Sequence, residues 1–208
     1  MNYDCNKLAE LLFPNVTETI EDLEKKYPER DLKEGARVTR FAPSPTGYLH
    51  IGGLFGALVD VLTAKATGGV AYLRVEDTDK KREIEDGVSA IINGFDSFGI
   101  DFDEGVTGFN TEKGAYGPYT QSKREMIYRT VIKEMIKRDL AYPCFCSKEE
   151  TDAVAEIQKK EGLRTGYYGR YAKCRRIPVS DAYDRIKNGE PFTLRLKSPG
   201  DFNKKVVI

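Results

Sequence analysis

Apolar side chains recur with the period of an amphipathic helix in three long stretches of the chain, within residues 51–67, 84–98 and 121–139. Short β-prone runs stand at 38–41 and 70–75, before and after the first of these stretches. The second run, VAYLRV, is nearly continuous and apolar, which is typical of a strand buried on both faces of a parallel sheet. Strands and helices that alternate at this spacing predict β-α-β units with right-handed crossovers, and therefore an α/β fold.

The first 36 residues predict a helical extension. Two apolar faces are separated by Pro14, Thr17 is placed to cap the second helix, and Pro28 ends it. We interpret this segment as an appendage that packs on the main domain and takes no part in catalysis.

After residue 140 the pattern predicts a mixed α+β segment. A charged helix runs from Lys148 to about Glu161, a short helix lies near 181–187, and the strand FTLRLK lies at 192–197. The final KKVVI, at 204–208, resembles the start of a strand without its polar end, so we interpret the sequence as cut there. The predicted segments are 1–36, 37–140 and 141–208.

Charge is balanced over the whole chain, with 33 basic and 33 acidic side chains, so the total gives no sign of a nucleic-acid or membrane partner. The distribution is uneven. Residues 121–208 hold 20 basic and 12 acidic side chains, which directs any polyanionic partner to the C-terminal part. No run approaches the roughly 18 apolar residues of a membrane span, and no leader pattern opens the chain, so we expect a cytoplasmic protein.

The richest candidate chemistry lies in RFAPSPTGYLHIGG, residues 40–53, where a strand passes through a stiff turn into a helix. This stretch contains His50, the only histidine of the chain, and Gly52 and Gly53 open the helix. Free backbone N–H groups and the helix dipole make such a helix start an anion site. The glycines let a flat ligand such as a nucleotide base approach the backbone, and the two prolines lower the entropic cost of ordering the turn.

The stretch resembles the first signature of class I aminoacyl-tRNA synthetases, whose general form is His-Ile-Gly-His, and its wording is similar to that of glutamyl-tRNA synthetases. Gly53 stands where the class form has a second histidine, as glutamyl enzymes commonly show. The resemblance covers residues 37–208. It implies a Rossmann-type parallel sheet in 37–140, the first half of the catalytic domain, and an inserted acceptor-binding module in 141–208.

The resemblance also implies a reaction and roles for individual residues. Glutamate and ATP would form glutamyl adenylate and pyrophosphate, and the glutamyl group would then pass to the terminal ribose of tRNA. His50 would act catalytically by stabilising charge on the phosphates, without any side-chain nucleophile. Arg40 suits a carboxylate clamp, and Glu76 would take the substrate ammonium. The full expected set is Pro43, His50, Gly52 and Gly53 for ATP, and Arg40, Ala42, Ser44 and Glu76 for glutamate.

The motif RVEDTD, residues 74–79, favours a glutamyl enzyme over a glutaminyl one. Glutaminyl relatives of the eukaryotic type are expected to show Phe-Asp-Asp-Thr-Asn at this place. Whether such an enzyme also charges glutamine tRNA depends on anticodon contacts outside these residues.

Three of the four cysteines, Cys144, Cys146 and Cys174, fall in one region. An odd cluster in a cytosolic chain favours a metal or plain burial over disulfides. The cluster resembles the zinc site in the acceptor-binding insertion of some glutamyl enzymes, where a tyrosine takes part. Tetrahedral zinc needs a fourth ligand, and Tyr167 is our candidate within GYYGRYAKC. Three reduced cysteines without a metal are the alternative.

The expected ligands are ATP with Mg²⁺, glutamate, and the acceptor arm of tRNA. The basic and aromatic segments KREMIYR and RYAKCRR would hold the tRNA. The second class I signature, a loop of the Lys-Met-Ser-Lys-Ser type, does not occur in the 208 residues. Because this loop is missing, we expect the 208 residues alone to activate little or no glutamate, although the parent protein is a ligase. We also expect a monomer.

Three alternatives stay open. A short paralogue that glutamylates a modified base of an aspartate tRNA shares the first motif and a zinc site, but EDTD and the N-terminal extension weigh against it. A non-catalytic tRNA-binding descendant of a synthetase is disfavoured because Arg40, Ser44, His50 and Glu76 are intact. A plain nucleotide-binding domain has no independent support, since Walker-type and Gly-x-Gly-x-x-Gly loops are both absent.

Overall fold

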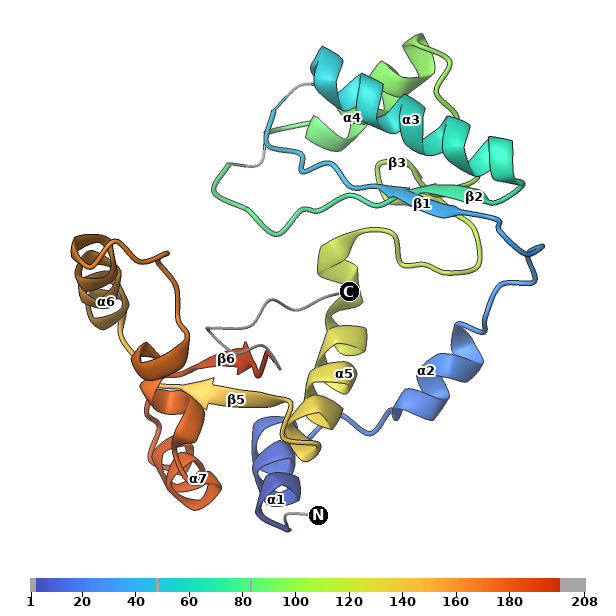
Figure 1. Cartoon of the computed structure of the whole chain (residues 1–208). Coiled ribbons are helices and arrows are strands. Elements are labelled where there is room, and N and C mark those ends of the chain that lie inside the picture. The colour runs from blue at the N-terminus through green and yellow to red at the C-terminus, as the bar shows by residue number, and fades with distance from the viewer. Residues whose placement is uncertain (1–2, 48, 83, 199–208) are drawn as a thin grey trace. The chain divides into compact units, whose positions relative to one another are not determined.

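The computed structural model describes residues 3–47, 49–82 and 84–198, which pack as two compact units (Figure 1). The sheet unit comprises residues 21–128. The cysteine unit comprises the residues up to Ile20 and those from Arg129 onward. Each unit has a hydrophobic core of its own, so the two are described separately.

A four-stranded sheet forms the centre of the sheet unit, in the order β1-β2-β3-β4. Strands β1, β2 and β3 pair in parallel, and β4 pairs antiparallel with β3. The predicted α/β class and its parallel β-α-β pairing are confirmed. The strands are β1 (Val38–Phe41), β2 (Val70–Leu73), β3 (Glu104–Gly108) and β4 (Thr111–Lys113).

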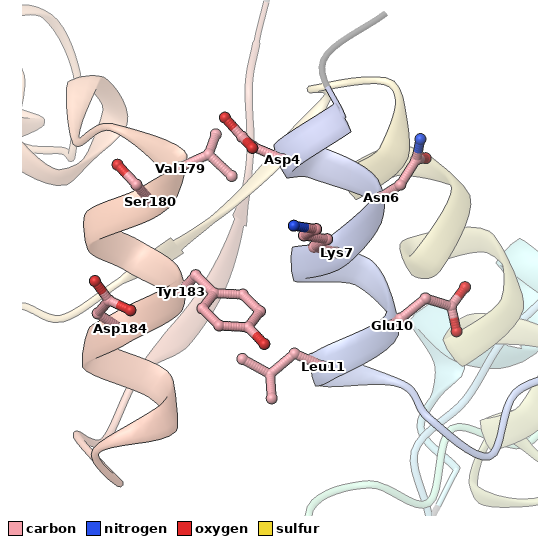
Figure 2. A pocket seen from close by; sticks show the side chains of 9 residues that line it. All are labelled: Asp4, Asn6, Lys7, Glu10, Leu11, Val179, Ser180, Tyr183 and Asp184. Carbon is pink, nitrogen blue, oxygen red and sulfur yellow. The ribbon is translucent and has the colours of Figure 1, made fainter.

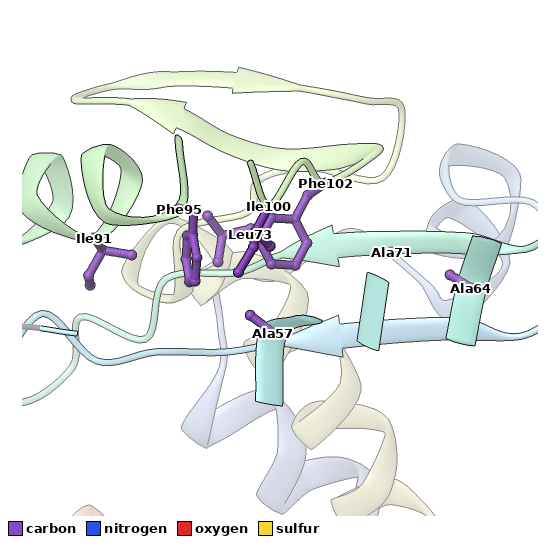
Figure 3. Packing of buried hydrophobic residues seen from close by; sticks show 8 residues of the cluster. All are labelled: Ala57, Ala64, Ala71, Leu73, Ile91, Phe95, Ile100 and Phe102. Carbon is purple, nitrogen blue, oxygen red and sulfur yellow. The ribbon is translucent and has the colours of Figure 1, made fainter. Parts of the chain in front are cut away.

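Two helices, α3 (Ile51–Thr67) and α4 (Gly87–Ser97), connect the parallel strands. Helix α3 ends where the sequence TGG predicts, because Gly68 takes a left-handed φ of 66° and its N–H caps the last turn. Alanines on α3 allow a close approach to the sheet. Figure 3 shows the resulting core, which contains Ala57, Ala64, Ala71, Leu73, Ile91, Phe95, Ile100 and Phe102.

Strand β2 is shorter and less buried than the apolar run VAYLRV predicts. It ends at Leu73, and its residues alternate between buried Ala71 and Leu73 and half-buried Val70 and Tyr72. The α-helical core covers one face, whereas Tyr72 meets only a smaller cluster around Val75 on the other. The prediction of a strand buried on both faces was therefore wrong for the second face.

The sequence pattern does not predict the hairpin of β3 and β4. The run from Glu104 to Gly108 contains two glycines and little apolar alternation. Asn110, which lies between the two strands with a φ of 60°, is the one local sign of a turn.

A charged network joins β3 to the segment before β1. Arg30 donates from Nη1 and Nη2 to the two carboxylate oxygens of Glu104 at 2.6 Å each, and the Tyr119 hydroxyl donates to Oε2 at 2.6 Å. The hydrogen bonds from Arg30 lower the pKa of Glu104, although burial opposes them. Burial and the bond to Glu104 raise the pKa of Tyr119 to about 12. The carboxylate thus stays ionised and fixes Arg30 against the sheet.

A two-stranded antiparallel sheet lies in the cysteine unit, where β5 (Ala141–Cys144) pairs with β6 (Thr193–Leu196). The division between the units falls within α5, after Tyr128. The other helices are α1 (Tyr3–Leu12), α2 (Ile20–Lys26), α5 (Glu125–Lys137), α6 (Lys148–Lys160) and α7 (Val179–Lys187), with 3-10 turns at Gln121–Arg124, Gly169–Tyr171 and Lys173–Arg176.

Helix α1 is anchored to α5 and α7 within the cysteine unit. The Lys133 ammonium, on α5, donates to the Glu10 carboxylate and to the Val16 carbonyl at 2.8 Å each. Figure 2 shows Lys7 and Leu11 of α1 on the side toward α7, and Val179 and Tyr183 of α7 on the side toward α1, along an open groove. The shared apolar core contains Leu8, Ala9, Ile136 and Ala141.

The boundaries between the two compact units differ from those of the predicted segments 1–36, 37–140 and 141–208. The extension is split, because α1 packs in the cysteine unit whereas the Arg30 pair holds the following segment in the sheet unit. Most of α5 joins the residues after 140 through the core that Ile136 and Ala141 share.

Three smaller expectations also need correction or a limit. Helix α2 begins at Ile20, so Thr17 is not its N-cap. Helix α7 begins at Val179, earlier than predicted. The strand start expected at 204–208 lies outside the described residues. Over the described ranges, no helix is both long and apolar enough to cross a membrane.

Replacing Glu104 with glutamine tests the charged network through its pH dependence. Because the pKa of Glu104 is lowered in the folded state, its stabilisation is complete above the unfolded-state pKa of about 4.3 and is lost as the pH falls through the lower folded-state value. Urea unfolding near pH 7 should find E104Q less stable by about 1.5–3 kcal/mol, the loss expected for hydrogen bonds to a charged group.

This stability difference should shrink as the pH falls toward about 3, since the wild-type carboxyl then becomes protonated as well. Glu112, exposed on β4, provides the control, and E112Q should change stability by no more than about 0.5 kcal/mol. A difference between wild type and E104Q that does not vary with pH would contradict this account.

Candidate functional site

His50 caps the helix that follows β1. Its backbone is extended at the N-cap of α3, and its Nδ1 accepts a hydrogen bond from the Gly52 N–H at 3.1 Å. Because Nδ1 accepts this bond, the proton of the neutral imidazole lies on Nε2, which is left to donate to another group. The side chain is exposed at the positive end of the helix dipole. This arrangement suits an anionic ligand such as a phosphate.

The glycines after His50 make this cap possible. A Cβ on Gly52 would lie 3.0 Å from Cε1 and 3.1 Å from Nδ1 of the His50 ring. A Cβ on Gly53 would lie 3.2 Å from the Leu49 side chain. The sequence predicts that these glycines admit a flat ligand, and the structure adds that they also admit the neighbouring side chains.

The turn before α3 is tied to the segment that follows β2. The Pro43 carbonyl accepts from the Glu76 N–H at 2.9 Å, and the Pro45 carbonyl accepts from the Ile84 N–H at 3.0 Å. Pro45 is fully buried, so the turn is fixed by packing as well as by its prolines. Residues of the two strand ends are thereby held side by side.

Arg40 and Glu76 meet at the carboxyl ends of β1 and β2. Arg40 Nη1 lies 3.5 Å from Glu76 Oε1, and Arg74 Nη2 donates to the same oxygen at 3.1 Å. The side chains of Arg40 and Glu76 are 40% and 30% exposed, whereas that of Arg74 is 17% exposed. Arg74 is therefore the more enclosed partner of Glu76, and Arg40 is the accessible cation.

Two further residues expected in the amino-acid pocket, Ala42 and Ser44, lie on the same turn. Ala42 is half-buried and Ser44 is exposed. The structure thus pairs Arg40 with Glu76, and His50 with Gly52. Arg40, His50 and Gly52 all lie on one segment, which runs from β1 through the turn into α3, whereas Glu76 follows β2.

Asp77, the next residue after Glu76, holds this loop to the start of the 3-10 turn before α5. Its Oδ1 accepts from the Ser122 N–H at 2.9 Å and its Oδ2 from the Ser122 hydroxyl at 2.5 Å, while Lys80 Nζ lies 3.2 Å from Oδ2. Burial alone would raise the pKa of Asp77, but these bonds bring it below its usual value. The ionised carboxylate fixes the position of Glu76 next to it.

In the cysteine unit, three cysteines come together: Cys144 at the end of β5, Cys146 two residues beyond it, and Cys174 in the 3-10 turn before α7. Their Sγ atoms all lie within 4.8 Å of one another, and Cys146 and Cys174 are 3.6 Å apart. The Tyr167 oxygen lies 3.2 Å from Cys146 Sγ and accepts from the Cys174 N–H at 3.1 Å. Of the three tyrosines in this loop, Tyr167 is therefore the one that lies against the cysteines.

Hydrogen bonds and a nearby cation shape the electrostatics of this cluster. Burial would raise the pKa of the Cys144 thiol, but hydrogen bonds, above all from Tyr167, lower it to about 7. Burial raises the pKa of Cys146 to about 11. The nearby Arg195 guanidinium also lowers the pKa of Cys144, and its Cζ lies 4.2 Å from the centroid of the Tyr167 ring. Three thiols and a phenol oxygen at these distances suit a tetrahedral metal ion.

The family model described as tRNA synthetases class I (E and Q), catalytic domain, matches residues 37–207. The chain belongs to this family. The class I synthetase membership confirms the resemblance seen in the sequence, and with it the class I catalytic-domain fold that the resemblance implies.

Curated class I synthetases resemble the chain along almost its whole length. A glutamate–tRNA ligase of Clostridium perfringens (strain 13) is 51% identical over 207 residues, which are 100% of this chain and 38% of that protein. A glutamate–tRNA ligase of Clostridium beijerinckii is 52% identical over 96% of this chain and 36% of that protein. The chain thus spans little more than a third of the length of these relatives.

A solved class I synthetase has the same fold. The crystal structure of a glutamate tRNA ligase from Elizabethkingia meningosepticum, in complex with its amino acid, matches with a TM-score of 0.67 and 34% identity. The match covers 80% of this chain and 33% of that one.

Sequence reasoning about this synthetase chain missed several residues that support the site. Arg74 and Asp77 lie inside the motif RVEDTD, so the sequence places them next to Glu76. Their hydrogen-bond partners can be identified only from the fold. Asp60 on α3 is also affected by Arg40: burial raises the pKa of Asp60, and the positive charge of Arg40 opposes that rise. Ser122 carries no local signal of its role.

Since His50 is the only histidine, its imidazole signals are unambiguous, and long-range ¹H–¹⁵N spectra can test the cap directly. For the neutral ring we expect the Nε2–H tautomer to predominate, because Nδ1 accepts the bond from Gly52. The G52A variant should shift the two nitrogens toward a solvent-like mixture, because its Cβ displaces the ring.

Gly47 supplies the matched control, since a Cβ at that position meets nothing within 4 Å. The G47A variant should keep the wild-type nitrogen shifts. Equal populations of the two tautomers in the wild type, or no change in G52A, would contradict the described cap.

Proposed function

We propose that this chain belongs to a glutamate–tRNA ligase, an enzyme that activates glutamate with ATP and transfers it to tRNA. The observation that carries the proposal is the Arg40–Glu76 pair at the ends of β1 and β2, because Arg40 lies on the same β1–turn–α3 segment as the His50 cap. The curated relatives described above all bear the name glutamate–tRNA ligase, which favours this function over the tRNA-modifying paralogue.

The charged pair suits an amino-acid substrate that carries both an ammonium and carboxylates. Arg40 is accessible and can exchange its ion pair with Glu76 for a carboxylate of glutamate. Glu76 then keeps its bond to Arg74 and offers its remaining lone pairs to the substrate ammonium. Ala42 and Ser44 would line the same pocket, with the Ser44 hydroxyl beside the carboxylate.

The start of α3 suits the phosphates of ATP. His50 would donate from Nε2 to a phosphate oxygen, while Pro43, Gly52 and Gly53 would lie against the nucleotide. The negative charge that develops on the phosphates during adenylate formation would be stabilised by this donor and by the helix dipole. Magnesium would enter with ATP, and pyrophosphate would leave with it.

The cysteine cluster fits zinc, with Cys144, Cys146 and Cys174 as thiolate ligands and Tyr167 as the oxygen ligand. A bound zinc would supply structural cross-linking, not catalysis, because four protein ligands leave no open position. It would fasten β5 to the loop that holds Tyr167 and Cys174.

The remaining expectations follow from the proposed reaction. The acceptor arm of tRNA would bind through basic side chains of segment 141–208, which we propose as the acceptor-binding module, with segment 37–140 as the first half of the catalytic domain. We also propose that the protein acts as a monomer in the cytoplasm, where tRNA and ATP are present.

The proposal is tested by ATP-dependent attachment of labelled glutamate to tRNA, measured with the complete gene product that contains this sequence. Loss of a bidentate contact to a carboxylate costs about 1.5–3 kcal/mol, so R40A should raise the KM for glutamate by about 10- to 100-fold. The KM for ATP should stay within about 2-fold, because the helix start is untouched.

Arg37, one residue before the opposite end of β1, provides a matched control of equal charge. The R37A variant should leave the KM for glutamate unchanged. Attachment of another amino acid by the wild type, or equal effects of R40A and R37A, would refute the assignment.

Metal content gives an independent test of the cysteine unit. Purified chain should hold one zinc per molecule by elemental analysis, and C174S should lose it. A strong chelator should lower the melting temperature of the wild type but not of C174S, because bound metal stabilises the folded state. The C5S variant, which changes the buried cysteine outside the cluster, should keep its zinc. Wild-type protein that takes up no zinc would refute this site.

A further inference from the structure

A hollow of about 470 Å³ opens on the surface of the cysteine unit, beyond the end of α6. None of the residues that line it is a ligand of the proposed zinc site. Two tyrosines supply its aromatic surface. The lining residues are Glu161, Leu163, Tyr168, Gly169, Arg170 and Tyr171.

The two tyrosine rings stand at right angles and are held by their hydroxyl groups. Their centroids are 6.2 Å apart, with an interplanar angle of 86°. The Tyr168 hydroxyl donates to the Arg164 carbonyl, and the Tyr171 hydroxyl donates to the Glu161 carboxylate. Arg170 braces Tyr171 with a bond to its oxygen at 2.7 Å and with a contact to its ring. Because the polar ends are already bonded, the rings are preorganised as binding surfaces.

Glycines set the backbone that positions these rings. Gly169, between the tyrosines, has a φ of 54°, a conformation that L side chains rarely adopt. A Cβ on Gly166 would lie 3.1 Å from the Tyr168 ring. The loop therefore fixes the aromatic corner through backbone shape as well as through the hydroxyl bonds.

The segment that forms the hollow has an excess of basic side chains, of which Lys159 and Lys173 pair with Glu156 and Glu150. Residues 159–176 contain seven basic side chains and one acidic side chain, Glu161, and that carboxylate is paired with Arg170 at 2.6 Å. Arg164 and Arg176 are exposed in this segment. An aromatic surface inside a basic segment is the combination that binds single-stranded nucleic acid, through base stacking and phosphate contacts together.

We propose that the hollow beside Tyr168 and Tyr171 receives an unstacked base of single-stranded RNA, while the surrounding basic side chains hold the flanking phosphates. The choice of RNA rests on the proposed function. The inference goes further than the proposed binding of tRNA phosphates by basic side chains, because it assigns a specific subsite for stacking a base. The groove between α1 and α7 offers a useful contrast: it also contains a tyrosine, Tyr183, but it is lined by three acidic side chains and one lysine (Figure 2).

Fluorescence anisotropy with a labelled single-stranded RNA of about 12 nucleotides, and with a blunt duplex of the same length, tests the subsite. Stacking contributes about 1–3 kcal/mol per base, so Y168L and Y171L should each weaken single-strand binding by about 5- to 150-fold. Leucine keeps apolar bulk in the hollow but removes the aromatic ring. Duplex binding should stay within about 2-fold, because duplex bases are already stacked.

Salt dependence separates stacking from phosphate contacts. The Tyr variants should leave the slope of log affinity against log salt unchanged, whereas R176A should reduce it by about one unit and weaken single strand and duplex alike. The Y183L variant should bind both probes like the wild type. Circular dichroism and melting temperature of each variant confirm that it is folded before binding is compared.

The possible results distinguish this inference from the function on which it rests. Single-strand binding by the wild type that survives in Y168L and Y171L would overturn the base-stacking subsite but leave RNA as a partner. The same holds for Tyr variants that lose single-strand and duplex binding equally. A wild type that binds neither RNA would overturn both the subsite and the proposed tRNA partner.

Discussion

The candidate site depends on the parallel pairing of β1 with β2, which continues past the ends of both strands. The Phe41 carbonyl accepts from the Arg74 N–H at 3.0 Å, and the Pro43 carbonyl accepts from the Glu76 N–H at 2.9 Å. Parallel strands point their carboxyl ends the same way, so two short segments far apart in sequence deliver their polar residues to one edge. The turn to α3 then begins from a backbone that is already fixed. Without this pairing the Arg40–Glu76 pair and the His50 cap would have no common frame.

Charge at this edge is arranged so that one ion pair can open without leaving a charge unpaired. Arg40 and Arg74 share a single oxygen of Glu76, and the shorter contact belongs to the more enclosed Arg74. When Arg40 turns toward an anion, Glu76 keeps its partner, so the cost of leaving a lone carboxylate is avoided. Asp77 adds rigidity through Ser122. The partly exposed setting makes the Arg40 contact weak enough to exchange.

The sequence predicts most elements of this fold because its helices and inner strands have clear periods and clear ends. TGG stops α3 where expected, and RFAPSPTGYLHIGG lies at a strand, a turn and a helix start. The hairpin after β3 is missed because glycines interrupt its alternation, and the split of the N-terminal extension is missed because Lys133 meets Glu10 across 123 residues of sequence. Local pattern carries residue types and spacing. It does not carry long-range partners, so the sequence proposes Arg40 and His50 as candidate site residues but gives no sign of the contacts that Ser122 and Arg195 make.

The cysteine unit follows the same logic of compensated charge. With a divalent metal bound, three thiolates would leave the cluster with a net negative charge, which is costly in a mostly buried setting. The sheet supplies the compensation, because the β5–β6 register pairs Tyr142 with Arg195, two residues along from Cys144. Arg195 lies over the Tyr167 ring and lowers the pKa of Cys144, so one guanidinium acts on both the thiol and the aromatic side of the cluster. Lys173 and Arg185 also interact electrostatically with Cys146 and Cys174, so a neutral side chain of the same length at position 195 would remove the cation next to Cys144 but leave these two.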